Sequence, residues 1–319
     1  MEIDDVEQAA RRIGENAIRT PVLRWPELDE LVSARVTLKA ELYQRTGAFK
    51  IRGAYNRIAL LEPATRRYGI IAGSSGNHGH AVAMLAHYLG IPAVVVVPSD
   101  IPHAKISAIR RYSARIVHYD PVRQDRETII EALARKSGLS VIPSSDDPVV
   151  TAGHGTVALE FFGQTGRLDR LVVPVGGGGL AAGSATVAKA LYPGIEVIGV
   201  EPSAGDDTAR SLELGQRIRI AAPATIADGL RHRIPGRFTF EVNRRLIDGI
   251  VTVTDVEIAA AMSFAWETAR LKTEPSGAAA LAAVLARRPD PAGRRVGVVL
   301  SGGNISAEGF HALVARLVS

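Results

Sequence analysis

Short apolar runs alternate with alanine-rich helical patterns along the whole chain. The apolar runs, such as residues 93–97, are continuous and contain no alternating polar positions, which indicates strands that are covered on both faces. Strands that alternate with helices favour a parallel α/β architecture. The pattern predicts strands at residues 36–40, 70–72, 93–97, 114–117, 171–175, 196–200, 250–253 and 295–300, and helices at residues 49–61, 77–89, 104–112, 126–136, 155–162, 180–191, 255–271 and 277–286.

A domain boundary is expected near Asp146-Asp147-Pro148, where a compact series of strand–helix units ends. Residues 66–146 are therefore predicted to form a small domain. This domain would be inserted into a large domain made of residues 1–65 and 147–319. Ligands of α/β proteins bind at the carboxyl ends of strands and between domains. We expect the functional site in the cleft between the two domains.

The composition is typical of a soluble globular protein. The chain has 319 residues, enough for one or two domains, and its apolar runs are far shorter than the roughly 20 residues of a membrane span. The amino terminus, Met1-Glu2-Ile3-Asp4-Asp5, lacks the basic and then apolar layout of a signal peptide. The absence of cysteine excludes disulfides, thiolate metal sites and a cysteine nucleophile. We expect a cytoplasmic protein that binds no membrane.

The net charge of +5 comes from 38 Lys and Arg residues against 33 Asp and Glu residues. The basic residues are spread among acidic ones, and aromatic residues make up only 5% of the chain. This pattern favours a solvated surface and argues against a nucleic-acid partner. A mildly positive field also suits an anionic cofactor and an anionic substrate.

Lys50 follows Phe49 at the start of a predicted helix, between Gly47 and Gly53. The positive end of the helix dipole disfavours an ammonium group there and helps the amine to remain nucleophilic. A surface lysine on an amphipathic helix is the simpler interpretation for most lysines. The aromatic and glycine neighbours favour a lysine that forms a Schiff base with a cofactor.

Four consecutive glycines, Gly176 to Gly179, follow a predicted buried strand and precede a predicted helix. A strand, a glycine turn and a helix amino terminus form an anion site made of backbone N–H groups. A tight turn alone would need fewer glycines.

The same glycine segment also approximates a dinucleotide fingerprint, because Ala181 follows at the right spacing and Glu201 ends the next strand. A nicotinamide-dependent oxidoreductase is therefore an alternative. It leaves Lys50 and two further glycine-rich turns, residues 74–79 and 301–304, without a role.

Taken together, the lysine and the three glycine-rich turns resemble those of fold-type II pyridoxal phosphate (PLP) enzymes of the serine/threonine dehydratase and serine racemase group. The resemblance implies an α/β fold with two open, twisted, mostly parallel sheets in a large and a small domain, with the cofactor between them. It extends nearly from end to end and covers residues 44–54, 74–79, 153–160, 176–183, 201–207, 225–230, 274–278 and 301–304.

The resemblance implies a role for each cofactor residue. Lys50 would carry PLP and then remove the α-proton of the substrate, with Phe49 beside the cofactor. Asn77 would hydrogen-bond the 3-hydroxyl of the ring, and Ser301 would face the pyridine nitrogen. A neutral serine there favours expulsion of a β-hydroxyl over transamination. The phosphate would be bound by Gly176, Gly177, Gly178, Gly179 and the amide of Leu180.

The loop before the second predicted helix is implied to bind the α-carboxylate of the substrate through Ser74, Ser75 and His78. In racemases of this group, the serine that matches Ser75 serves the face opposite the lysine. Some dehydratases carry the same Ser-Ser-Gly-Asn-His run, so elimination and racemisation both remain open.

The acidic segment from Glu201 to Asp207 suggests a metal site, although its spacing alone is more typical of a solvated loop. The resemblance implies Glu201, the carbonyl of Gly205 and Asp207 as ligands. Hard oxygen ligands suit Mg²⁺, and also Ca²⁺ or Mn²⁺.

Several residues depart from the family pattern near the expected cleft. His154 stands where a glutamine is usual, and Pro143-Ser144 replaces a common His-Pro pair. Gly73 is smaller than the usual residue and is expected to make room for a larger β-substituent. Arg126 matches a position that meets a second carboxylate in some relatives, although an exposed charge at a helix start is the simpler interpretation.

The sequence therefore predicts a PLP-dependent ammonia-lyase for a small β-hydroxy amino acid of the serine, threonine or 3-hydroxyaspartate class. A serine or aspartate-type racemase, a β-replacement enzyme and a PLP-binding protein without catalysis are the alternatives. The resemblance also implies a homodimer. Because the chain ends soon after residues 301–304, no carboxyl-terminal regulatory domain is expected.

Overall fold

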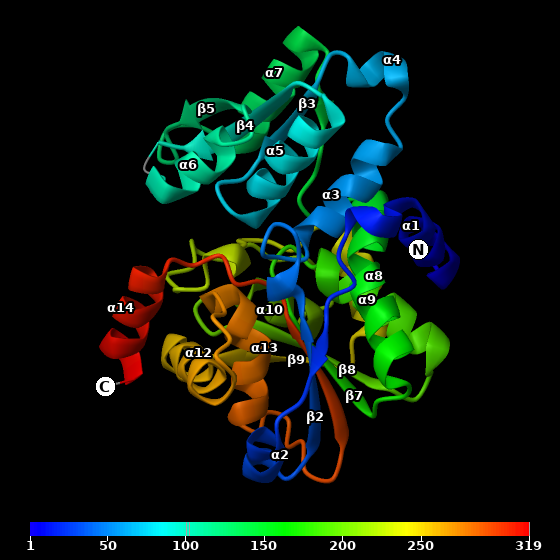
Figure 1. Cartoon of the computed structure of the whole chain (residues 1–319), viewed down its shortest axis with the longest axis vertical. Helices are drawn as coiled ribbons and strands as arrows, with labels where there is room; N and C mark the ends of the chain where they lie inside the picture. The colour runs from blue at the N-terminus through cyan, green and yellow to red at the C-terminus, as the bar shows by residue number, and fades with distance from the viewer. Residues whose placement is uncertain (100, 102, 319) are drawn as a thin grey trace.

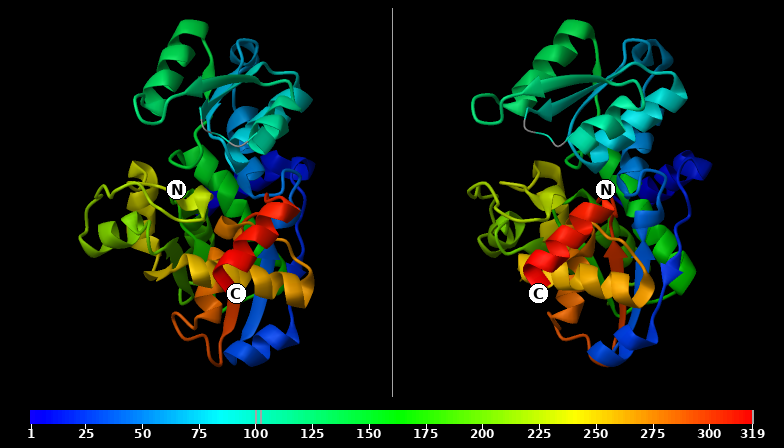
Figure 2. Two further views of the ribbon diagram at one scale, coloured as in Figure 1. Left: turned by 90° about the vertical axis from the view of Figure 1, so that its left-hand side faces the viewer. Right: turned by 60° about the vertical axis from the view of Figure 1, so that its left-hand side comes forward.

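The computed structural model describes residues 1–99, 101 and 103–318, apart from the side chains of residues 103–105. Two halves, each built around one sheet, lie one above the other (Figures 1 and 2). The strands of the smaller sheet fall within residues 70–141, and the strands of the larger sheet come from the segments on either side. The predicted fold class, an α/β chain with two mostly parallel sheets, is confirmed.

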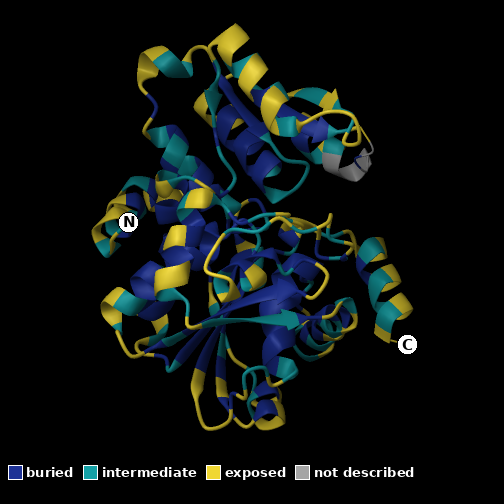
Figure 3. Cartoon of the chain, turned by 180° about the vertical axis from the view of Figure 1, so that it is seen from behind, coloured by how far each residue is buried: buried dark blue, intermediate teal, exposed yellow. Residues whose placement is uncertain are grey.

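The larger sheet is parallel except for its first edge strand, which pairs antiparallel with its neighbour. The opposite edge strand is half-exposed, whereas the central strands are buried on both faces (Figure 3). In spatial order the strands are β1 (Val22–Leu23), β2 (Arg35–Ala40), β10 (Arg295–Leu300), β7 (Arg170–Pro174), β8 (Glu196–Pro202) and β9 (Gly249–Val253).

Helices cover both faces of this sheet, which explains why its strands are continuous apolar runs. Val172 packs into the core on one face, and the next residue, Val173, packs into the core on the other. The first face is covered by α12 (Asp255–Ala269) and α13 (Pro275–Leu285), with α2 (Pro26–Val32) and α14 (Ala307–Val318) beside them. The second face is covered by α1 (Ile3–Ile13), α8 (Pro148–Thr165) and α9 (Gly179–Leu191).

The smaller sheet is entirely parallel and is also covered on both faces. In spatial order its strands are β5 (Arg115–Tyr119), β4 (Ala93–Pro98), β3 (Ile70–Gly73) and β6 (Ser140–Val141). One face packs against α5 (Asn77–Leu89) and α6 (His103–Arg110), and the other against α7 (Arg126–Ser137).

All eight predicted strands are present, with ends that differ from the prediction by no more than two residues. The helix predicted at residues 155–162 is too short, because α8 begins at Pro148, where the Asp147 side chain accepts a hydrogen bond from the amide of Val150. The pattern did not predict β1, β6, α1, α2, α14, α4 (Pro63–Arg66), α10 (Asp207–Glu213) or α11 (Arg237–Leu246). Within the described chain, no helix is long and apolar enough to cross a bilayer.

Glycines inside α8 let it pack directly on the backbones of two other helices. A β-carbon at Gly153 would lie 2.7 Å from the carbonyl oxygen of Arg52, and one at Gly155 would lie 2.9 Å from that of Gly183. Glycine lowers helix propensity, which is why the sequence pattern predicted only part of this helix. Close packing between helices outweighs that local preference.

A buried ionic network fixes α3 (Lys50–Ala59) to the larger sheet and to α8. Arg52 is 1% exposed, and its guanidinium donates to both carboxylate oxygens of Glu41, each at 2.9 Å. It also donates to Glu160 of α8, at 2.7 Å and 2.9 Å. The fully buried Lys39 of β2 donates to the same Glu160 at 2.9 Å. The network balances two cations against two carboxylates, so no charge in it is left unpaired.

Replacing Arg52 tests how much this network contributes to stability. We expect Arg52→Met to lower the free energy of unfolding by about 3–5 kcal/mol, because Glu41 would keep a buried charge without its partner. The control is Arg11→Met, which breaks an exposed pair between Arg11 and Glu7 and is expected to cost less than about 1 kcal/mol. Chemical denaturation of both variants measures the difference. Equal, small losses would show that the network does not hold the fold together.

Candidate active site

The predicted serine and glycine segments of the site follow the carboxyl ends of parallel strands, and Lys50 begins α3. Residues 74–76 follow β3, residues 175–178 follow β7, and Ser301 follows β10. Helix α3 lies at the junction between the two halves (Figure 1). This placement is the usual ligand position in open α/β sheets.

Lys50 is the first residue of α3, as predicted. It is partly buried, and its Nζ atom donates a hydrogen bond of 2.7 Å to the carbonyl oxygen of Ser144. The same Nζ atom lies 5.0 Å from the centre of the Phe49 ring. Burial lowers the pKa of Lys50 to about 8. The fraction of the amine that is neutral and nucleophilic near neutral pH is therefore much larger than for an ordinary lysine.

The four-glycine loop leads into α9, and hydrogen bonds from side chains of α11 hold it in place. Gly178 adopts a left-handed conformation, with φ of +82°. The hydroxyl of Thr239 donates to the carbonyl oxygen of Gly177 at 2.9 Å, and Asn243 donates to that of Gly178 at 3.4 Å. A β-carbon at Gly177 would overlap the hydroxyl of Ser145. The loop therefore needs glycine, and it presents the amino terminus of a 13-residue helix to an anion.

The loop after β3 brings together the three residues that were expected to bind a carboxylate. Ser74 accepts a hydrogen bond from the amide of Gly76 at 3.2 Å, and Ser75 is half-buried beside it. The Nε2 atom of His78 lies 2.8 Å from the carbonyl oxygen of Ile142, whereas its Nδ1 atom is buried without a partner among the described residues. Burial, with the charge of Lys50, lowers the pKa of His78 to about 3. The imidazole is therefore neutral.

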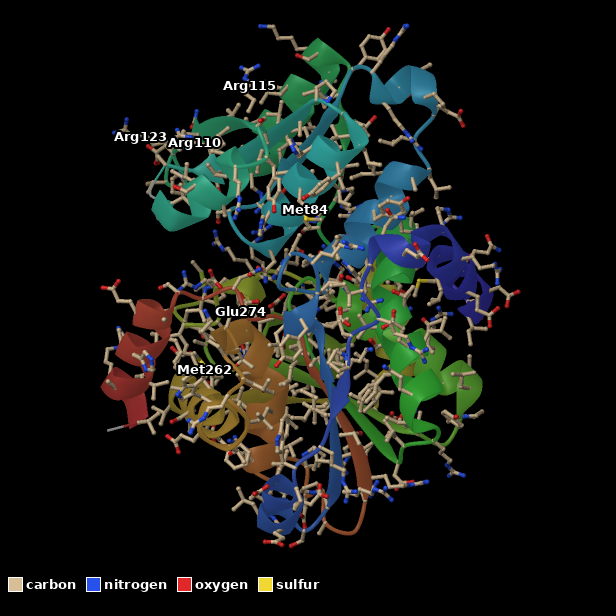
Figure 4. The ribbon with its side chains drawn as sticks, viewed as in Figure 1. Met84, Arg110, Arg115, Arg123, Met262 and Glu274 are labelled. Atoms are coloured by element: carbon tan, nitrogen blue, oxygen red, sulfur yellow. The ribbon has the colours of Figure 1, made fainter. Side chains whose placement is uncertain are left out.

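Asn77 links three loops of the site. Its amide nitrogen donates to the carboxylate of Glu274, and its oxygen accepts a hydrogen bond of 2.7 Å from Asn304. Asn304 also donates to the carbonyl oxygen of Thr46, at 2.7 Å. Glu274 lies where the larger half faces the smaller one (Figure 4). The sequence pattern gave Glu274 no role of its own, because a single acidic residue before a helix is not distinctive.

Ser301 is buried at the end of β10. Its hydroxyl donates a long hydrogen bond of 3.5 Å to the carbonyl oxygen of Ser276, and its carbonyl oxygen accepts one of 3.1 Å from the amide of Phe49. The expected pyridine-facing residue is thus joined to the segment that carries Lys50.

Gly73 does not leave an empty space, so the expected room for a larger β-substituent is not there. A β-carbon at Gly73 would overlap the Cδ1 atom of Ile130 and lie 3.0 Å from the Cδ atom of Arg126. The glycine instead lets the Arg126 side chain cross the end of β3. The guanidinium pairs with Glu127 at 2.6 Å, and its charge lowers the pKa of His78. Arg126 therefore lies against the end of β3 while its guanidinium pairs with Glu127.

The predicted metal ligands include two buried carboxylates. Glu201 accepts hydrogen bonds from the amides of Thr208 and Ala209, at 3.1 Å and 2.8 Å. Both carboxylate oxygens of Asp207 are buried without a partner among the described residues. Burial and the charge of Asp207 raise the pKa of Glu201 to about 8, and burial raises the pKa of Asp207 to about 7. Unpaired buried oxygens of this kind fit a hard divalent cation.

The described residues contain no cluster of three or more histidine or acidic side chains with the geometry of a metal site. A cation bound here would therefore need backbone carbonyl groups, such as that of Gly205, and water molecules to complete its ligands.

Comparison with known proteins gives a consistent result. The model of the family described as "Pyridoxal-phosphate dependent enzyme" matches residues 13–302. An L-threo-3-hydroxyaspartate ammonia-lyase from a Pseudomonas species is 42% identical over 97% of both chains. A serine racemase from Schizosaccharomyces pombe is 40% identical over 96% of this chain and 95% of its own. The structure of maize serine racemase superimposes with a TM-score of 0.93 at 35% identity, covering 99% of this chain and 98% of that one.

The chain belongs to the family of pyridoxal phosphate-dependent enzymes. The oxidoreductase alternative is thereby excluded. The residues of this enzyme also fit the cofactor on physical grounds. A lysine with a lowered pKa stands at a helix start, and a glycine loop that tolerates no side chain at Gly177 opens at the start of α9.

The lowered pKa of Lys50 predicts how cofactor attachment depends on pH. We expect the rate of covalent PLP uptake by the apo-protein to rise with pH with a midpoint near 8 and then to level off, because only the neutral amine attacks the aldehyde. An ordinary lysine would give a midpoint near 10.5. Absorbance after rapid mixing at a series of pH values measures the rate, and Lys50→Ala should show no covalent uptake. A midpoint near the ordinary value would contradict the burial of this amine.

Proposed function

We propose that this enzyme is an ammonia-lyase that converts a β-hydroxy amino acid with a second carboxylate, of the 3-hydroxyaspartate class, to a 2-oxo acid and ammonia. The substrate class is proposed from the position of Arg126. Its side chain crosses Gly73 and so brings a cation to the end of β3, beside the loop (residues 74–76) that is proposed to bind the α-carboxylate. The Pseudomonas relative, whose name states this activity, supports the proposal.

We assign the cofactor residues as follows. Lys50 carries the cofactor, Phe49 packs beside it, Asn77 contacts the ring hydroxyl, and Ser301 faces the ring nitrogen. The phosphate is bound by Gly176, Gly177, Gly178, Gly179 and Leu180. PLP, when bound, supplies the electron sink that stabilises the negative charge left at the substrate α-carbon.

The protein's own groups bind the substrate and move its proton. Ser74, Ser75 and the backbone amide of His78 bind the α-carboxylate, and Arg126 binds the second one. Lys50 accepts the α-proton, and its lowered pKa lets the amine act as a base near neutral pH. The β-hydroxyl takes up the proton held by Lys50 and leaves as water. The resulting enamine tautomerises to an imine, whose hydrolysis consumes one water, so the net products are the 2-oxo acid and ammonia.

A racemase is the second candidate, because serine racemases are among the relatives. Ser75 is the proposed second proton carrier, on the substrate face opposite Lys50. Ser75 is half-buried in the loop after β3, which leaves its side chain accessible to a bound substrate.

We further propose that residues 1–65 and 147–319 form the large domain and residues 66–146 the small one, with the cofactor between them. This division follows the distribution of strands between the two sheets. A cytoplasmic homodimer is proposed from the resemblance alone.

The substrate proposal is tested by measuring 2-oxo acid formation from L-threo-3-hydroxyaspartate, L-serine, L-threonine and D-serine. We expect Arg126→Gln to lower kcat/KM for 3-hydroxyaspartate about 30-fold, which corresponds to about 2 kcal/mol for one charge-assisted hydrogen bond. The value for L-serine, which lacks a second carboxylate, should change little.

The matched control is Arg123→Gln, which removes the same charge from a side chain on the outer end of the small half (Figure 4). It should leave both values unchanged. Equal losses on both substrates would contradict a contact between Arg126 and the second carboxylate. Conversion of L-serine to D-serine without 2-oxo acid would favour the racemase.

We propose that Glu201, the carbonyl of Gly205 and Asp207 bind Mg²⁺, with Ca²⁺ and Mn²⁺ as further candidates. A concentration of Mg²⁺ about 100 times its dissociation constant is expected to raise the free energy of unfolding by about 2.7 kcal/mol. Thermal unfolding with Mg²⁺ or with a chelator measures the effect, which Asp207→Asn should abolish. Asp206→Asn is the control, because the Asp206 carboxylate already pairs with Arg210 at 2.8 Å. An equal response of both variants would contradict this site.

A further inference from the structure

Two histidines lie against the ends of the four-glycine loop. His232 follows the short helix η3 (Asp228–Leu230) and packs on the first two glycines. A β-carbon at Gly176 would lie 3.1 Å from the Nδ1 atom of His232, and one at Gly177 would lie 3.0 Å from its Nε2 atom. The edge of the ring that carries the polar atoms therefore faces the loop.

His154 approaches the other end of the same loop from α8. A β-carbon at Gly179 would lie 3.1 Å from its Nδ1 atom. The residue is fully buried, and its ring meets the Phe49 ring edge to face with centres 4.7 Å apart. His154 therefore touches both the glycine loop and the residue next to Lys50.

The polar atoms of these two rings lack partners. Both ring nitrogens of His154 and the Nδ1 atom of His232 are buried without a hydrogen bond to any described residue. An unpaired buried polar group costs roughly 1–3 kcal/mol, so native proteins rarely leave one without a purpose. Unpaired atoms at both ends of one anion-binding loop indicate a ligand that satisfies them when it binds.

Both rings are neutral at physiological pH. Burial, followed by the charge of Lys50, lowers the pKa of His232 to about 4 and holds the pKa of His154 well below its usual range. A neutral imidazole carries one N–H donor and one acceptor. A phosphate oxygen can accept a hydrogen bond from such a donor without the burial of another charge.

We propose that His154 and His232 donate hydrogen bonds to the cofactor phosphate, so that side chains at both ends of the glycine loop supplement its backbone amides. The inference rests on the proposed phosphate site at Gly176 to Gly179 and adds two ligands to it. It assigns phosphate binding to His154, which is one of the departures from the family pattern. It also assigns a role to His232, to which the sequence pattern gave none.

The test compares the dissociation constants of PLP and of pyridoxal, which has the same aldehyde and no phosphate. We expect His154→Leu and His232→Leu each to weaken PLP binding about tenfold and to change pyridoxal binding less than about twofold. His154→Asn and His232→Asn, whose amide groups stand near the position of Nδ1, should recover part of the loss. The ³¹P resonance of bound PLP should shift in both leucine variants. His118→Leu, at an exposed position of β5, is the control.

Each outcome has a distinct meaning. Equal weakening of PLP and pyridoxal would show that the histidines only pack the site, which overturns the inference and leaves the glycine loop in place. A loss specific to PLP in one leucine variant alone would overturn the two-sided arrangement. No preference of the wild-type protein for PLP over pyridoxal would contradict the proposed phosphate site itself. If a leucine variant fails to fold, the asparagine variants and the ³¹P resonance decide the question.

Discussion

The geometry of the site depends on the burial of one charge, that of Arg52. Removing a guanidinium from water costs several kcal/mol unless every donor is satisfied, and here Glu41 and Glu160 satisfy it from two different parts of the fold. Both pairs can form only when α3 has one orientation about its own axis and one distance from α8 and the larger sheet. Lys50 precedes Arg52 by two residues on the same helix, so the network that holds the arginine also orients the lysine.

Close backbone contacts transmit this constraint to the glycine loop. Gly153 lets α8 touch α3, and Gly155 lets the same helix touch Gly183 of α9, whose first turn follows the loop. The positions of Lys50 and of the helix start at Gly179 are thereby set by one packed unit of three helices. A cofactor with an aldehyde at one end and a phosphate at the other needs such a fixed separation, and side chains larger than hydrogen at these glycines would change it.

The sequence predicted what depends on local pattern. The strands followed from continuous apolar runs, and Lys50 and the glycine loop followed from their neighbours. Features that depend on distant segments were missed or misread. Helix α11 is polar and carries no motif, yet Thr239 and Asn243 hold the glycine loop. Gly73 suggested free space, because nothing nearby in the sequence shows that Ile130 and Arg126 fill it from α7. Packing between residues more than 50 positions apart cannot be inferred from either segment alone.

The distribution of charge around the site explains why it suits anions. The carboxylates near α3 are neutralised by Arg52 and Lys39, and Glu274 accepts a hydrogen bond from Asn77. His78, His154 and His232 are kept neutral by burial and by the charge of Lys50. Arg126 pairs with Glu127 at 2.6 Å, so the field that favours anions at the site comes from the amino terminus of α9 and from Lys50 when it is protonated. A cofactor phosphate and substrate carboxylates meet that field directly, whereas a cationic or neutral ligand gains nothing from it.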